Sequence, residues 1–135
     1  MSIFKLSNLI FLLFFADKPL CSIEQKRVYG IARHEETKIS CEVESFPPPT
    51  SFRWSFNNTA EIVEVPPESF SRSAQQIPQS KRFTSTLTYK PTTDMDYGTV
   101  MCWATNSAGE QTEPCVFHII GAGEKVSNDV ILKIF

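Results

Sequence analysis

A chain of 135 residues has room for one domain, and 41% hydrophobic residues are enough to form a buried core. The net charge is −2, and the 13 basic residues are scattered along the chain. This balance does not favour a nucleic-acid-binding protein, which needs a concentrated basic surface. The 11 phenylalanines favour strands over helices.

Residues 1–16 have the pattern of a secretory signal peptide. Lys5 precedes an unbroken apolar run from Leu9 to Phe15, and the small residue Ala16 follows. The run is too short to span a bilayer, which takes about 20 residues. We therefore expect a secreted protein, or a plasma-membrane ectodomain if the chain belongs to a longer protein. The alternative is a gene-model artefact, because a pyrimidine-rich stretch before a splice acceptor also translates into Phe and Leu.

The segment 17–122 is predicted to be one domain made of strands. Residues 17–32 are expected to form a single edge strand, with Pro19 near its start and Gly30 marking a kink or a switch between sheets. Further stretches alternate apolar and polar residues, as half-buried strands do. These predicted strands cover residues 37–44, 51–56, 82–89, 100–105 and 115–120. The polar segment 61–81 is irregular, and no strand is placed in it.

Alternation also divides each predicted strand into two faces. The residues expected to point inward are Ile39, Cys41, Val43, Phe52, Trp54, Phe56, Phe83, Ser85, Leu87, Tyr89, Val100, Cys102, Ala104, Cys115, Phe117 and Ile119. Their neighbours along each strand, Ser55 among them, are expected to point outward. Gly109 closes a hairpin turn between the last two predicted strands.

The most specific pattern is formed by two cysteines and a tryptophan. Cys41 and Cys102 lie on two of the predicted strands, and Trp54 lies on a strand between them. This order is typical of immunoglobulin sandwiches, in which a disulfide joins the two sheets and the tryptophan packs against it. We therefore predict an all-β, immunoglobulin-like antiparallel β-sandwich of the I-set or V-like kind, with Greek-key connections.

Cys21 and Cys115 remain once that bridge is assigned. The first strand can pair beside the last in this fold, so we predict a second disulfide between them. The alternative is that Cys21 is removed with a signal peptide and Cys115 is left free. Zinc is disfavoured because no C-x-x-C motif occurs and the two histidines stand alone. No cofactor is expected.

One position departs from the usual pattern. Immunoglobulin domains often carry a tyrosine two residues before the second cysteine, with its hydroxyl tied to the backbone at the corner before that strand. Here the position is Val100. The corner hydrogen bond is therefore expected to be absent, with burial of Val100 in its place. Tyr97 lies nearby but out of phase with the inward positions.

Asn57-Asn58-Thr59 is an N-glycosylation sequon, expected on the surface of a secreted protein. The motif is short, so occupancy of Asn57 is left open. Residues 123–135 are predicted to be a linker or a disordered tail, too short for a membrane anchor. Read-through beyond a splice donor from Val126 is one explanation of this tail, and a functional terminal peptide is the other.

Several runs of residues resemble an immunoglobulin domain of the arthropod Sidestep family, over about residues 17–122. The runs are Pro19–Cys21, Val28–Ala32, Cys41–Glu44, Phe46–Pro49, Phe52–Asn58, Asp96–Asn106 and Glu113–Phe117. The family consists of membrane adhesion proteins with several immunoglobulin domains. The resemblance implies a role in cell adhesion and axon guidance, with a Beaten-path-type immunoglobulin receptor as the partner. No binding residue carries over from it.

The leading functional hypothesis is protein recognition through the outward face of the sheet that contains the Trp54 and Cys102 strands. Its candidate residues are Arg53, Met101, Trp103, Val116 and His118. An outward tryptophan beside apolar residues predicts an exposed patch, unless neighbouring side chains cover it. The second hypothesis is a structural spacer in a larger ectodomain. An enzyme is disfavoured, because no nucleophile motif or Gly-rich phosphate loop accompanies the two histidines.

Overall fold

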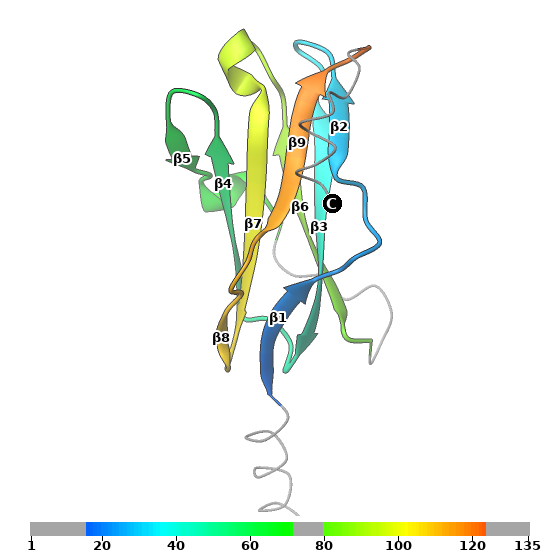
Figure 1. Ribbon diagram of the computed structural model, residues 1–135, viewed down its shortest axis with the longest axis vertical. Helices are drawn as coiled ribbons and strands as arrows, with labels where there is room; N and C mark the ends of the chain where they lie inside the picture. The colour runs from blue at the N-terminus through cyan, green and yellow to red at the C-terminus, as the bar shows by residue number, and fades with distance from the viewer. Residues whose placement is uncertain (1–15, 72–79, 124–135) are drawn as a thin grey trace, which may run out of the picture.

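The computed structural model describes residues 16–71 and 80–123, which fold into a sandwich of two β-sheets (Figure 1). One sheet has the order β1-β3-β6, and the other has the order β2-β9-β7-β4-β5, with the short β8 also pairing with β7. The strands are β1 Asp17–Cys21, β2 Val28–Ile31, β3 Thr37–Phe46, β4 Ser51–Asn57, β5 Ile62–Glu64, β6 Arg82–Tyr89, β7 Gly98–Asn106, β8 Gly109–Glu110 and β9 Cys115–Gly121. This arrangement confirms the all-β sandwich.

The predicted signal peptide and tail fall, apart from Ala16 and Gly123, outside the described residues. Among the described residues, there is no helix with the length and apolar character needed to cross a membrane. Within residues 16–71 and 80–123, the helical turns are two short 3-10 segments, η1 at Pro67–Ser69 and η2 at Asp94–Asp96.

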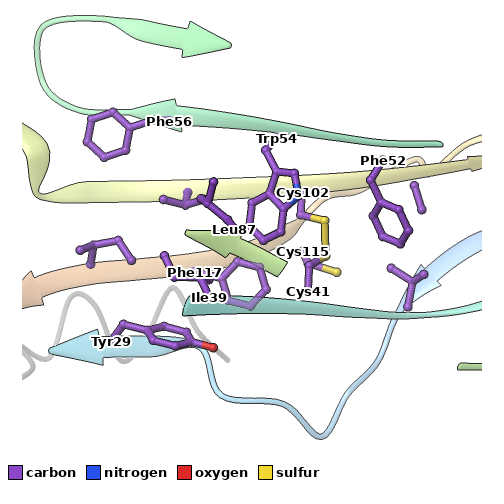
Figure 2. Packing of buried hydrophobic residues seen from close by; sticks show 14 of the residues in the cluster. Tyr29, Ile39, Cys41, Phe52, Trp54, Phe56, Leu87, Cys102, Cys115 and Phe117 are labelled. Atoms are coloured by element: carbon purple, nitrogen blue, oxygen red, sulfur yellow. A yellow bond between two sulfur atoms is a disulfide. The ribbon is translucent and has the colours of Figure 1, made fainter. Parts of the chain in front are cut away.

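The core lies between the two sheets and is centred on Trp54 (Figure 2). The indole stacks on Phe117, with ring centroids 6.0 Å apart. The predicted Cys41–Cys102 disulfide is present, with a Cα–Cα distance of 6.5 Å, and joins the two sheets. The residues predicted to point inward are buried, except Tyr89, which is half-buried. The period-two pattern therefore assigned the core correctly in the predicted strands.

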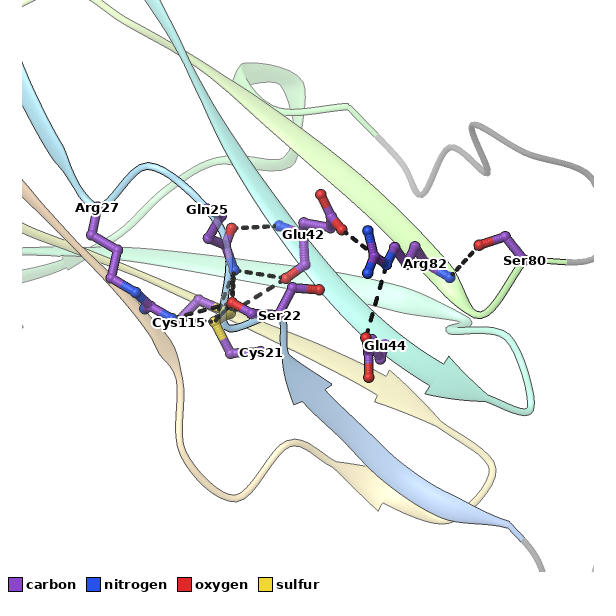
Figure 3. A network of polar contacts seen from close by, with 9 residues as sticks. All are labelled: Cys21, Ser22, Gln25, Arg27, Glu42, Glu44, Ser80, Arg82 and Cys115. Atoms are coloured by element: carbon purple, nitrogen blue, oxygen red, sulfur yellow. Dashed lines mark hydrogen bonds and ion pairs between the residues drawn. A yellow bond between two sulfur atoms is a disulfide. The ribbon is translucent and has the colours of Figure 1, made fainter. Parts of the chain in front are cut away.

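The prediction of one edge strand over residues 17–32 is wrong, because this segment forms two strands in different sheets. β1 pairs antiparallel with β3, whereas β2 pairs parallel with β9. The crossing lies at residues 22–27, and Gly30 sits inside β2 rather than at the switch. At the crossing, the Gln25 carboxamide makes the hydrogen bonds to the β3 backbone that a neighbouring strand would otherwise make. It donates to the Glu42 carbonyl and accepts from the Glu42 amide, both at 2.9 Å (Figure 3).

The predicted Cys21–Cys115 disulfide is also present, with a Cα–Cα distance of 5.4 Å. The first strand was expected to pair beside the last, but the two cysteines come from different sheets. Cys21 lies on β1 beside β3 in the three-stranded sheet, and Cys115 lies on β9 in the other sheet. Both disulfides therefore connect the two sheets.

The corner between β6 and β7 carries a tyrosine hydrogen bond after all. Val100 is fully buried, as expected, but the Tyr89 hydroxyl donates to the Asp96 carbonyl at 2.5 Å. Tyr97 makes a second such bond, to the Ile31 carbonyl at 2.8 Å. The expectation that the corner lacks this kind of bond is wrong, because Tyr89, from a different position than the usual tyrosine, reaches the backbone there.

The segment 61–81 contains β5 and η1, neither of which the sequence had placed. β5 pairs with the end of β4, and Phe70 forms an isolated antiparallel bridge with Leu87 of β6. Residues 72–79 lie outside the described part of the chain. Short strands of this kind carry too few residues to show an alternating pattern.

Candidate interaction surface

The surface opposite the core on the larger sheet is called the outer face. Alternation along β4, β7 and β9 places on it Arg53, Ser55, Asn57, Thr99, Met101, Trp103, Val116 and His118. Strand register arranges these residues in rows. Arg53 lies opposite Trp103, Ser55 lies opposite Met101, and Asn57 lies opposite Thr99. Met101 and Thr99 are in turn opposite Val116 and His118.

Arg53 is the centre of the most ordered part of this face. Its guanidinium lies 3.9 Å from the centroid of the Trp103 ring. Its Nε and Nη2 donate to the two carboxylate oxygens of Glu110 at 3.1 and 3.0 Å, and Nη1 donates to Glu64 at 3.0 Å. Glu64 comes from β5 and Glu110 from β8, so four strands contribute to this group. We call Arg53, Glu64, Trp103 and Glu110 the arginine cluster.

Mutual hydrogen bonding stabilises the charged forms in this cluster. Hydrogen bonding to Glu110 is the largest effect that raises the pKa of Arg53. The same hydrogen bond is the largest effect that lowers the pKa of Glu110. The arginine and the carboxylate therefore stay ionised at neutral pH. Because both side chains remain partly exposed, the ion pair contributes only about 0–1 kcal/mol to folding.

The cluster changes the expected character of Trp103. The sequence predicted an open apolar patch, with a covered ring as the alternative. The structure gives an intermediate result, because Trp103 is half-buried and one side of its ring carries the Arg53 guanidinium. Met101 and Val116 are likewise half-buried on the same face. The outer face thus presents an aromatic ring with a fixed guanidinium stacked on one side and apolar side chains beside it.

Two residues on this face are less accessible than predicted. His118 was expected to be exposed, but only 8% of it is, so this expectation is wrong. Its place in the middle of the sheet explains the difference, because Val28 of β2 and Thr99 of β7 flank it on both sides. Ser55 was expected to point to solvent, but it is 1% exposed and its hydroxyl has no hydrogen-bond partner among the described residues.

Sequence reasoning missed the exposed apolar edge of the outer face. Ile62 is opposite Asn57 in the β4–β5 pair and is 69% exposed, and its neighbour Val63 is also exposed. Leu20, on β1 of the other sheet, and Ile23, in the crossing segment 22–27, are exposed as well. Leu20 lines an open cavity of about 470 Å³ together with Asp17, Lys18 and Phe46. Each of these apolar residues lies in a short strand or outside the strands, where no alternating pattern could show which side it faces.

A sandwich whose sheets are joined by a disulfide packed against a buried tryptophan is the architecture of an immunoglobulin-like domain. Comparison with protein-family models agrees. The model described as "Immunoglobulin domain" matches residues 18–106, and the chain belongs to this family. A search of curated protein sequences finds no match.

Several solved structures are similar to this chain. One is the crystal structure of Dpr2 Ig1-Ig2 in complex with DIP-Theta Ig1-Ig3, with a TM-score of 0.57 and 22% identity over 78% of this chain and 33% of that one. Another is a Dscam structure on isoform specificity, with a TM-score of 0.52 and 19% identity over 78% of this chain and 25% of that one. The BTLA ectodomain has a TM-score of 0.53 and 15% identity, over 78% of this chain and 99% of that one.

These likenesses establish the fold. The chain spans about a third of the matched Dpr2–DIP-Theta chain and a quarter of the Dscam chain.

Proposed function

We propose that this immunoglobulin domain is a recognition module of cell adhesion and axon guidance, secreted or on a cell surface, and that it binds a protein on another cell through its outer face. The observation that carries the proposal is the arginine cluster. Arg53 is held in one orientation by two carboxylates and the Trp103 ring, while about 41% of its side chain stays exposed. Tryptophan and arginine are enriched among the residues that contribute most to binding energy, and such residues cluster near the centres of interfaces.

Fixing Arg53 in advance favours association. An arginine with free rotamers loses side-chain entropy when it binds, whereas this one is already ordered by the folded domain. Half-buried Met101 and Val116 lie on the same face beside the cluster, on β7 and β9. The partner surface that fits this arrangement has an acidic or carbonyl-rich group for Arg53 and an apolar area for Trp103. A Beaten-path-type immunoglobulin receptor is our first candidate, on the resemblance to the Sidestep family.

Support from the comparisons is general. One similar structure contains a complex between immunoglobulin domains of two different proteins, which is the kind of contact proposed here. The alternative is that the domain is a spacer in a larger ectodomain. Two inter-sheet disulfides and a well-filled core suit that role equally well.

The test measures binding of the full chain to a panel of Beaten-path-type receptor ectodomains and to itself. Trp103→Ala should weaken binding by more than about 10-fold, the scale of an interface hot spot. Leu20→Ala is the matched control, because Leu20 is 66% exposed on the other sheet. It should leave affinity unchanged, and both variants should melt within a few degrees of the wild type.

Two outcomes would overturn the proposal. One is unchanged affinity of Trp103→Ala for a receptor that binds the wild type. The other is a large fall in its melting temperature, which would show that Trp103 serves folding. Failure of the wild-type chain to bind any member of the panel would favour the spacer.

A further inference from the structure

The sequon Asn57-Asn58-Thr59 lies where β4 ends and the turn to β5 begins. Its two asparagines have different environments. The Asn58 carboxamide is hydrogen-bonded through both its nitrogen and its oxygen, since it donates to the Met95 carbonyl at 2.8 Å and accepts from the amides of Ala60 and Glu61 at 2.8 and 2.9 Å. In contrast, the structure gives the Asn57 carboxamide no hydrogen bond to any described residue. Asn57 is half-buried, and Thr59 is exposed.

The register places Asn57 on the outer face, on the same side of β4 as Arg53. Asn57 lies opposite Thr99 on one side and Ile62 on the other, so the pleat continues to the end of the strand. Two residues along a strand span about 7 Å, and four span about 13 Å. Asn57 is therefore one row from Met101 and two rows from Trp103.

We propose that Asn57 carries an N-linked glycan, and that this glycan covers the rows of the outer face that contain Thr99 and Met101. The arginine cluster is then the part of the face that stays open to a protein partner. In the transfer, the Asn57 Nδ2 forms a bond to the anomeric carbon of a lipid-linked oligosaccharide diphosphate. The bond from that carbon to the diphosphate oxygen breaks, its electron pair leaves with the lipid diphosphate, and Nδ2 loses one proton to a base.

Two features of the site make it suitable for this modification. Substitution at the Asn57 Nδ2 competes with no hydrogen bond within the described residues, whereas the Asn58 Nδ2 already donates to the Met95 carbonyl. The glycan would also lie over Ile62, which is otherwise a large apolar side chain with 69% of its surface in water. A bulky, hydrated oligosaccharide solubilises such an edge and blocks strand pairing there.

The part of the inference that concerns partner contact rests on the proposed function, but the glycan and its shielding are tested without any partner. The full chain is translated with endoplasmic-reticulum microsomes or secreted from animal cells, and peptides containing Asn57 are analysed by mass spectrometry. We expect a glycan that peptide N-glycosidase removes, with conversion of Asn57 to aspartate. Thr59→Ala and Asn57→Gln should both lose it. Asn58→Gln preserves the sequon and should keep it, although the turn loses its hydrogen bonds.

Shielding is measured as the rate of Met101 oxidation by hydrogen peroxide, which depends on access to the thioether. We expect a several-fold slower rate in the glycosylated wild type than in Thr59→Ala, while acrylamide quenching of Trp103 is the same in both. An unmodified Asn57 overturns the site, and equal Met101 rates in a glycosylated protein overturn the shielding. Either result leaves the binding test of Trp103→Ala valid, so the two proposals fail separately.

Discussion

The Nε1–H of Trp54 donates a hydrogen bond to the Ser85 hydroxyl at 3.0 Å, across the core between the two sheets. The same hydroxyl donates to the Ser71 carbonyl at 2.7 Å. Ser85→Ala would leave the indole N–H without a partner in a fully buried position. We expect the free energy of unfolding to fall by about 1–3 kcal/mol, measured by urea titration. Ser40→Ala, at an exposed position on the adjacent strand, should change it by less than about 0.5 kcal/mol.

Tyr89 should make the domain sensitive to alkali. Burial, and then the nearby charge of Asp96, raises its pKa above the ordinary value of 10.0. A phenol with a raised folded-state pKa stabilises the fold fully below its unfolded pKa, and this stability is lost as pH rises beyond about 10. Tyr89→Phe should flatten the loss of stability above pH 10. At neutral pH it should cost about 1 kcal/mol, because the bond to Asp96 is absent. An unchanged alkaline slope would contradict this explanation.

Arg53→Ala should uncover Trp103. The chain has two tryptophans, and Trp54 is fully buried, so acrylamide quenching of fluorescence reports mainly on Trp103. Quenching should increase in the variant, and stability should fall by about 0.5–1 kcal/mol with the loss of the cation–π contact. Arg82→Ala is the control. Arg82 lies on the three-stranded sheet, away from Trp103, and pairs with Glu42 and Glu44 of the same sheet, so its removal should leave quenching unchanged. Equal quenching in all three proteins would mean that Arg53 does not cover the ring in solution.

Removing the second disulfide should weaken the domain without unfolding it. The Cys21→Ser/Cys115→Ser double variant loses a bridge between residues 94 apart, but the Cys41–Cys102 bridge already shortens the loop that it closes. We expect a loss of about 3 kcal/mol in urea titrations and retention of the fold by circular dichroism. The double variant avoids a free thiol, which a single substitution would create. A loss below about 1 kcal/mol would contradict this expectation.

The sequence predicted the core well because long strands repeat one physical rule many times. β3, β4, β6, β7 and β9 each have enough residues for alternation to identify the inward side, and the cysteine and tryptophan spacing fixes which strands face each other. Ser85 shows the limit of the rule. Its inward direction was predicted, but its role as the acceptor for Trp54 depends on a contact across the sandwich.

Errors arose where a tertiary contact replaced a local one. The split between β1 and β2 depends on the Gln25 side chain binding the backbone of Glu42, 17 positions away, which no local pattern shows. The predicted strand 100–105 stops before Asn106, yet Asn106 belongs to β7, is buried and donates to the carbonyls of Asp17 and Pro47. For the outer face, the sequence identified Arg53 and Trp103 but not Glu64 and Glu110, because their strands are only two or three residues long.

The second disulfide also determines how the domain responds to mechanical force. β1 begins at one end of the sandwich, and β9 ends at the other (Figure 1). A pull on the two ends of the domain reaches the Cys21–Cys115 bond before it reaches the residues between them. Those residues cannot be drawn out as extended chain while the bridge is intact, even if the sheets separate. Oxidised, the domain behaves as a link of nearly fixed length, and reduction would convert it into an extensible one.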